Sequence, residues 1–258
     1  MFCCDFAAAF REGGCGDPPK NSRYAGKFLS ILGDSISTLA GYQPDGYKVF
    51  YKAERCRRAG VHTPQDTWWG QVISHFGAQL LVNNSWSGSR VSCLPASREL
   101  FPAGCSDERT GGLHRGAQQP DVILVFLGTN DWAFGVDPHL GHAPSSPLCG
   151  CTAFDYAYDR ILSRLRCNYP GAEIWCCTLC TARPPSDPSL VLPRVSSGHS
   201  LEEYSQNILD TAAKHRCRGI DLDAFRLPYN SMDGVHPTAD GMRTLASLVI
   251  RGMETASL

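Results

Sequence analysis

The chain alternates between short, mostly apolar runs and longer segments in which apolar residues recur every three or four positions. Short apolar runs bounded by glycine, proline or polar residues are typical of buried parallel strands. The longer segments have the spacing of amphipathic helices that pack one face on a core. The sequence therefore predicts five strands, in residues 28–32, 78–85, 121–127, 172–179 and 218–222. It predicts helices in residues 67–77, 154–171, 201–217 and 237–253.

Strands that alternate with helices are expected to form a doubly wound α/β fold with a five-stranded parallel sheet, because right-handed crossovers place helices on both faces. One domain, residues 27–258, accounts for all of these elements, and residues 1–26 precede it as an irregular N-terminal extension. Two connections, residues 91–119 and 132–152, are long, rich in Gly, Pro and Ser, and leave from the carboxyl side of a strand. Ligands bind at that edge of open α/β sheets, so we expect both loops to serve function.

Composition and charge narrow the possible partners. The chain has 258 residues, 43% of them hydrophobic, and a formal net charge of −1. This balance gives no field that would gather nucleic acid or an anionic membrane, and no apolar stretch is long enough for a membrane span. Asp5 stands where a signal peptide would carry a basic residue. We expect a cytoplasmic protein, although a chain whose export signal had been removed would have the same pattern.

The 13 cysteines are an unusually high number. In a chain of this length without an export signal, reduced thiols are expected rather than a disulfide framework. Cys177 and Cys180 form a C-x-x-C, but Pro184 and Pro185 follow in place of the helix that would lower the pKa of a redox thiol. We interpret them as buried structural thiols. Two further pairs lie in loop-like sequence, and spacing alone leaves their bonding open: Cys93 with Cys105, and Cys149 with Cys151.

Four short polar motifs lie at strand ends or in a terminal turn. They are "GDS" at 33–35, "NSWSGS" at 84–89, "GTND" at 128–131 and "DGVHP" at 233–237. Each motif alone is common in turns and caps. Together and in this order they resemble the blocks of the SGNH/GDSL hydrolase family, which includes esterases and lipases. The resemblance spans most of the chain and implies a flavodoxin-like three-layer α/β/α sandwich, in agreement with the alternation of elements.

Carried over to this sequence, the resemblance implies a catalytic triad of Ser35 as nucleophile, His236 as general base and acid, and Asp233 as the residue that orients the imidazole. It also implies an oxyanion hole made by the N–H groups of Ser35 and Gly88 and the side-chain amide of Asn130. An Asp and a His three residues apart in a turn can place the carboxylate on Nδ1 and leave Nε2 free for the serine proton.

Residues next to the proposed catalytic and oxyanion residues have predicted structural or substrate-binding roles. Pro237 suits a first helical turn, so we expect His236 at the start of the last helix. Asp34 and Asp131, inside their motifs, are expected to hold loops through backbone hydrogen bonds. Trp86 and Trp132 flank the proposed oxyanion residues and are candidate substrate contacts, with packing of the loops as the alternative. Arg90 is a third candidate contact, with a pair to Asp107 or Glu108 as the alternative.

The sequence thus predicts a serine esterase without metal or cofactor, acting on a small-molecule acyl ester through an acyl-enzyme intermediate. The leading substrate class is an O-acetylated carbohydrate. A lipase-like or thioesterase activity on longer acyl chains stays open, because the two long loops would decide the shape of the cleft. A non-catalytic ligand-binding domain of the same fold and a thiol redox or metal-binding protein are further alternatives. The oligomeric state is also left open.

Overall fold

A five-stranded parallel sheet forms the centre of the molecule. The computed structural model describes residues 22–93, 101–140, 151–184 and 195–255. The sheet has the order β2-β1-β3-β4-β8, and every neighbouring pair is parallel. Its strands are β1 (Phe28–Gly33), β2 (Gln79–Ser85), β3 (Val122–Phe126), β4 (Glu173–Cys177) and β8 (Arg218–Ile220). The five predicted strands and the flavodoxin-like order are confirmed.

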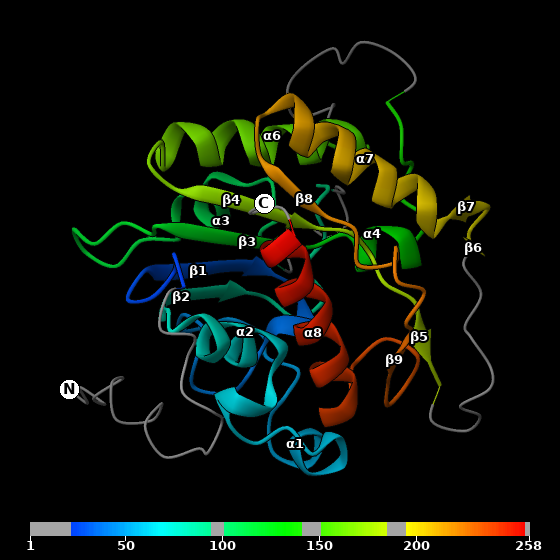
Figure 1. Ribbon diagram of the computed structural model, residues 1–258. Helices are drawn as coiled ribbons and strands as arrows, with labels where there is room; N and C mark the ends of the chain where they lie inside the picture. The colour runs from blue at the N-terminus through cyan, green and yellow to red at the C-terminus, as the bar shows by residue number, and fades with distance from the viewer. Residues whose placement is uncertain (1–21, 94–100, 141–150, 185–194, 256–258) are drawn as a thin grey trace.

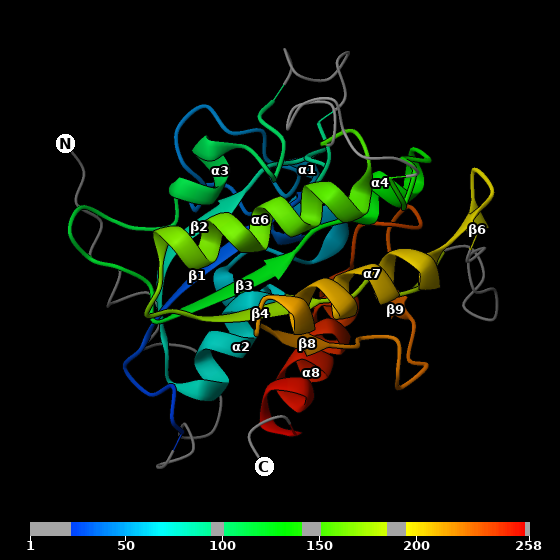
Figure 2. The same cartoon turned by 90° about the horizontal axis from the view of Figure 1, so that it is seen from above.

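Four long helices cover the sheet on its two faces. Helices α6 (Phe154–Asn168) and α7 (Leu201–Lys214) lie together on one face, whereas α2 (Trp68–Phe76) and α8 (Ala239–Thr255) lie on the other (Figures 1 and 2). All four were predicted from apolar spacing. Glycine in the left-handed conformation ends α2 at Gly77 (φ +64°), while α7 begins with a capping box between Ser200 and Glu203.

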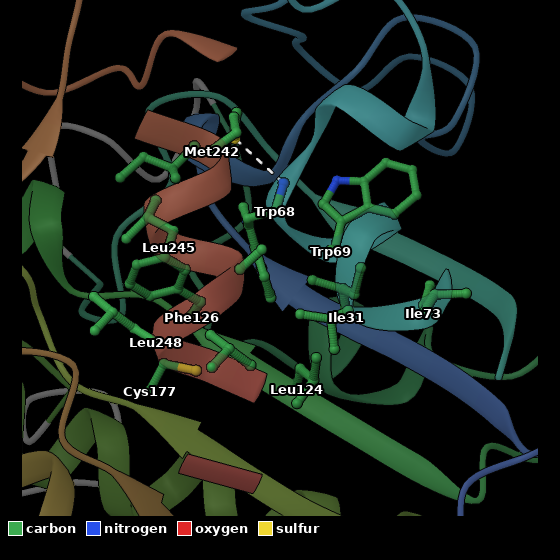
Figure 3. Close-up of a cluster of buried hydrophobic side chains, with 14 of the residues drawn as sticks. Ile31, Trp68, Trp69, Ile73, Leu124, Phe126, Cys177, Met242, Leu245 and Leu248 are labelled. Carbon is green, nitrogen blue, oxygen red and sulfur yellow. Dashed lines mark hydrogen bonds between the residues drawn. The ribbon is translucent and has the colours of Figure 1, made fainter. Parts of the chain in front are cut away.

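Side chains on the two faces of the central strands belong to two separate apolar cores. Along β3, Leu124 and Phe126 point to the α2/α8 side, and Ile123 and Val125 to the α6/α7 side. The α2/α8 core contains Trp68, whose backbone N–H lies 3.4 Å from the sulfur of Met242 (Figure 3). Burial on both faces explains why these strands read as continuous apolar runs.

Several short elements lie outside the sequence prediction. They are the helices α1 (Glu54–Ala59), α3 (Asp107–Gly111) and α4 (Thr129–Ala133), the 3-10 turns η1 (Ser35–Ser37) and η2 (Pro64–Asp66), and the strand pairs β5 (Ala182–Arg183) with β9 (Tyr229–Asn230) and β6 (Val195–Ser196) with β7 (His199–Ser200). These pieces are two to six residues long and too short to show a period. Helix α3 lies within the 91–119 connection, and α4 begins at the GTND motif.

The described cysteines are all free thiols. Cys177 and Cys180 are buried, as expected for structural thiols, and burial raises the pKa of Cys177 to about 12. Where the 91–119 and 132–152 connections meet, the thiol of Cys105 forms a hydrogen bond with that of Cys151, and this bond raises the pKa of Cys105. Cys149 and most of residues 1–26 lie outside the described residues. No helix in the described ranges combines the length and apolar character that a membrane crossing requires.

Candidate active site

Three of the four polar motifs begin where neighbouring strands end. In the sheet, Gly33 at the end of β1 pairs with Ser85 at the end of β2 and with Phe126 at the end of β3. Parallel strands bring their carboxyl ends to one edge, the side on which α4 and the β5/β9 pair lie (Figure 1). The GDS, NSWSGS and GTND segments therefore meet there, as the sequence predicted for the edge of the sheet.

Ser35 lies on a rigid turn immediately after β1. It begins the 3-10 turn η1, whose N-cap is Asp34, and the carboxylate of Asp34 accepts the N–H of Ile36 at 2.9 Å. The hydroxyl and the backbone N–H of Thr38 both donate to the carbonyl of Ser35. These bonds fix the backbone on both sides of Ser35, so its hydroxyl has a defined direction.

The imidazole of His236 joins Ser35 to Asp233. Nε2 lies 2.9 Å from the Oγ of Ser35, and Nδ1 lies 2.8 Å from Oδ2 of Asp233. Burial raises the pKa of Asp233, but hydrogen bonds from the ring and the backbone N–H of His236 outweigh it and lower the pKa to about 2. The carboxylate is therefore ionised and can only accept, which places a proton on Nδ1. In the neutral ring Nε2 is then an acceptor, ready for the serine proton.

The turn that carries Asp233 and His236 is clamped from both sides. The hydroxyl of Tyr51 donates to the carbonyl of Pro237, and that of Tyr229 to the carbonyl of Val235, each at 2.7 Å. The expectation that Pro237 lies in the first helical turn is wrong, because α8 begins at Ala239. Pro237 instead forms an isolated β-bridge with Ser231, so extended backbone holds His236 ahead of the helix.

Phe50 is a contact of the imidazole that the sequence did not reveal. Its ring stacks on that of His236 with 3.4 Å between centroids and an interplanar angle of 6°. The guanidinium of Arg55 lies over the same phenyl ring, 4.5 Å from its centroid. The backbone N–H of Phe50 donates to the hydroxyl of Thr38, so this residue is tied to the turn of Ser35. The imidazole is thus held by packing as well as by hydrogen bonds.

The predicted oxyanion donors lie on the loops that follow the first three strands. Gly88 has φ +87°, a conformation that side chains with a Cβ rarely adopt. The amide of Asn130 donates to the carbonyl of Ser89 at 2.8 Å, and its second amide hydrogen is left for a substrate. Within the described residues, the backbone N–H groups of Ser35 and Gly88 have no hydrogen-bond acceptor. Each group can therefore donate to a ligand.

The acidic residues inside the motifs hold loops, as predicted. Asp131 is fully buried and accepts the backbone N–H groups of Val91 and Ser92 at 2.7 and 2.9 Å. These bonds attach the loop after Gly88 to the start of α4. Burial raises the pKa of Asp131, and the hydrogen bonds from Val91 and Ser92 offset part of this rise.

The three predicted substrate contacts lie at the same edge, and their contact with substrate stays a prediction. The ring of Trp86 packs on that of Tyr47, with 4.2 Å between centroids. The indole N–H of Trp132 donates to the carbonyl of His199 at 3.3 Å. The guanidinium of Arg90 lies over the ring of Phe134. The alternative pairing of Arg90 is wrong for the described residues, because Asp107 contacts Arg160 and Arg164 instead and Glu108 forms no ion pair with Arg90 there.

A small apolar cavity borders the imidazole turn. Its lining includes Gly234 and Val235 from that turn, Thr129 and Trp132 from α4, and Leu179 after β4. The volume open to the centres of water-sized groups is about 20 Å³, which is room for little more than one such group. No set of three or more His, Cys, Asp or Glu side chains in the described ranges could hold a metal ion.

Asp34 makes the stability of the site region dependent on pH. Burial raises its pKa to about 7, whereas the ordinary value is 3.8. The native state therefore prefers the protonated acid, so the stability that this group contributes is full below about pH 4 and is lost as the pH rises through 7. Asparagine keeps an oxygen for the N–H of Ile36 but does not ionise. We expect Asp34→Asn to raise the melting temperature relative to the wild type at pH 8 and not at pH 4.

Thermal unfolding of both proteins between pH 4 and pH 8 measures this difference. The exposed Asp45 gives a matched control, and Asp45→Asn should keep the pH dependence of the wild type. Melting curves of Asp34→Asn that run parallel to the wild type over the whole range would contradict the assignment.

Comparisons with known proteins show the family to which the chain belongs. Residues 27–186 match the model of the GDSL-like Lipase/Acylhydrolase family. A crystal structure from Bacteroides uniformis, provisionally described as a GDSL-like lipase, has 25% identity and a TM-score of 0.68, covering 89% of this chain and 96% of its own. A similarly described Bacteroides ovatus structure has 23% identity and a TM-score of 0.69, covering 90% and 99%.

An acetyl-xylooligosaccharide esterase from Geobacillus shares the fold, with 19% identity and a TM-score of 0.54, covering 90% of this chain and 96% of its own. No curated protein sequence matches significantly. Fold and family model together define a serine hydrolase that acts on ester bonds. The chain belongs to the GDSL-like lipase/acylhydrolase family. The matched range contains Ser35, Gly88 and Asn130 and ends before Asp233, so the last motif depends on the geometry described above.

Proposed function

We propose that the protein is a serine esterase that hydrolyses small acyl esters, with Ser35, His236 and Asp233 as its catalytic triad. The observation that carries this proposal is the 2.9 Å contact between Nε2 of His236 and Oγ of Ser35, two residues 201 positions apart. An acceptor nitrogen on a serine hydroxyl, with a carboxylate on the opposite nitrogen, is the arrangement that activates serine for attack. The proposal is also supported by three hydrogen-bond donors at the same edge of the sheet, which are the N–H groups of Ser35 and Gly88 and the amide of Asn130.

The reaction follows from this geometry in two transfers. Oγ of Ser35 attacks the ester carbonyl carbon while its proton passes to Nε2, and the carbonyl oxygen becomes an oxyanion. Its charge is stabilised by the N–H groups of Ser35 and Gly88 and the amide of Asn130. The C–O bond of the ester then breaks, and Nε2 returns the proton to the leaving alcohol. Water attacks the acyl-Ser35 ester in the same way and releases the acid.

The small cavity beside the imidazole turn supports a small acyl group. Thr129 is next to Asn130, and Val235 is next to His236, so the cavity adjoins the proposed oxyanion site. Its 20 Å³ suits a methyl group better than a long chain. The indole rings of Trp86 and Trp132 nearby offer flat apolar surfaces of the kind that pack on sugar rings. The structural likeness to an acetyl-xylooligosaccharide esterase makes an O-acetylated carbohydrate the leading substrate.

A panel of p-nitrophenyl esters tests the size of the acyl group. We expect kcat/KM to be highest for acetate or propionate and to fall at least about tenfold by octanoate, because overfilling a packed site costs about 1–3 kcal/mol. Acetylated xylo-oligosaccharides run beside the panel, with release of acetate as the measurement. If kcat/KM rises with chain length, the substrate is a longer acyl ester and the cavity is not the acyl site.

A further inference from the structure

Arg109 is a fully buried arginine beneath the candidate active site. It belongs to the short helix α3, in the connection between β2 and β3, and its exposed fraction is 0%. The ring of Tyr47 lies 5.8 Å from its guanidinium carbon, and Tyr47 in turn packs on Trp86. The side chain therefore points from α3 towards the carboxyl ends of β1 and β2.

The guanidinium makes five hydrogen bonds, as many as it has N–H groups. Nε donates to Oδ1 of Asn84 at 2.8 Å. Nη1 donates to Oγ of Ser89 at 2.6 Å and to the carbonyl of Pro102 at 3.4 Å. Nη2 donates to the carbonyls of Gly33 and Asn84 at 2.8 and 3.0 Å. Its five donors are fixed in one plane, so these acceptors are held relative to one another.

The acceptors belong to the segments that carry the proposed catalytic groups. Gly33 is the last residue of β1, two positions before Ser35. Ser89 follows Gly88, and its carbonyl also accepts the amide of Asn130 at 2.8 Å. One guanidinium thus connects the strand end before the nucleophile to the loop of Gly88, and Ser89 of that loop in turn holds the amide of Asn130.

The charge of Arg109 is not explained by ion pairing. Within the described residues, no carboxylate lies within ion-pair distance of its guanidinium, and the acceptors above are carbonyl, amide and hydroxyl oxygens. Burial lowers its pKa to about 10, so it remains charged at neutral pH. The charges of Asp34 and Glu108 lie near enough to raise its pKa, but they offset the effect of burial only in part, so the cation is costly to bury. The hydrogen bonds of its guanidinium, and not an ion pair, are therefore the feature of Arg109 that calls for an explanation.

We propose that Arg109 is the positioning residue of the oxyanion hole, which sets the N–H of Gly88 and the amide of Asn130 relative to Ser35. This inference rests on the proposed function. The guanidinium itself touches loops and not substrate, and it acts through Gly33 and Ser89. Its effect should therefore appear in the stabilisation of the transition state and not in the binding of substrate.

Substitutions at both ends of the network test the proposal. We expect Arg109→Met to lower kcat on p-nitrophenyl acetate about a hundredfold, the usual effect of losing one oxyanion donor, with KM within about threefold. Arg109→Lys keeps the charge but loses the planar fork and should lower kcat about tenfold. Ser89→Ala removes one acceptor and should lower kcat about threefold to tenfold. If the arginine variants do not fold, Ser89→Ala decides the outcome.

A serine-directed phosphonate supplies a second measurement. Its phosphoryl oxygen occupies the oxyanion position, so the labelling rate should fall in parallel with kcat, while the final stoichiometry stays at about one label per chain. Tyr169→Phe is the matched control. The hydroxyl of Tyr169 accepts the N–H of Leu113 and donates to the carbonyl of Gly111, in the connection between β2 and β3 that also carries Arg109. In the described ranges it has no hydrogen bond to the segments of Ser35, Gly88 or Asn130.

The results separate the possible failures. A fall in kcat and labelling rate in the arginine variants, but not in Tyr169→Phe at equal melting temperature, supports positioning. Values of kcat within about twofold of wild type in folded Arg109→Lys or, failing that, Ser89→Ala would overturn the inference. The same holds if Tyr169→Phe loses as much activity as they do. A wild-type protein that neither hydrolyses the ester nor takes the label refutes the proposed function itself.

Discussion

Replacing Ser35 by alanine is expected to lower kcat on p-nitrophenyl acetate by about ten-thousandfold or more. Among the described residues, this hydroxyl is the group hydrogen-bonded to Nε2 of His236, and it is the proposed nucleophile. The melting temperature should change little, because Oγ of Ser35 makes no other hydrogen bond in the described part of the chain. Initial rates of hydrolysis and thermal unfolding of the same preparation measure both effects.

The location of the covalent label makes this prediction specific. Mass spectrometry of the phosphonate-treated wild type should find the adduct on the peptide containing Ser35, and the alanine variant should stay unlabelled. Ser37 is a matched control in the same 3-10 turn, where its hydroxyl accepts the indole N–H of Trp68 at 3.1 Å. Ser37→Ala should still be labelled. Activity that survives in Ser35→Ala, or an active wild type labelled elsewhere, would remove Ser35 as the nucleophile.

The elements that could be predicted from sequence are those whose buried residues recur at the spacing of a strand or a helix within a short stretch of the chain. β3 is apolar at every position because helices cover both of its faces, and β4 is apolar at every position after Glu173. Helix α6 shows its buried stripe at helical spacing and ends at Asn168, before Pro170 and Gly171. The strand assignment also predicts that the GDS, NSWSGS and GTND motifs meet at the carboxyl edge of the sheet, whereas the roles of Ser35, Gly88 and Asn130 come from the family resemblance.

The features that could not be predicted depend on partners far away in the chain. In sequence, Arg109 stands in "DERTGG" and reads as part of a solvated surface, whereas its acceptors come from β1, β2 and the segment between β2 and α3. Phe50 reads as an ordinary core residue until His236 is found stacked on it across 186 positions. The misplacement of Pro237 has the same origin. The isolated bridge to Ser231 and the hydroxyl of Tyr51 hold it in extended backbone, and neither partner is visible in local sequence.

Replacing Asp233 by asparagine is the substitution with the second largest expected effect. The carboxylate fixes the ring so that Nδ1 carries the proton and Nε2 accepts. An asparagine amide can donate to Nδ1 instead, which would leave the proton on Nε2 and prevent it from accepting that of Ser35. We expect kcat to fall about a hundredfold to ten-thousandfold. The side chain of Asp233 is 46% exposed, so water can take over part of the role of the carboxylate. If water does so, the fall in kcat should be nearer a hundredfold.

The backbone should survive this substitution, which allows the effect to be assigned to the imidazole. Oδ1 of Asp233 accepts the N–H groups of Val235 and His236, and an asparagine oxygen can accept both. Asp240→Asn, at the exposed start of α8, is the matched control and should keep wild-type kcat.

The dependence of kcat on pH is an independent test of the same prediction. Because the pKa of Asp233 is about 2, the carboxylate stays ionised throughout the range in which the protein is assayed, and its protonation should not limit the wild-type rate above about pH 4. In Asp233→Asn the proton is held on Nε2 by a change of tautomer that pH does not reverse, so the residual rate should stay below that of the wild type at every pH of the assay. A variant with kcat within about threefold of wild type and an unchanged pH profile would show that Ser35 and His236 act without Asp233.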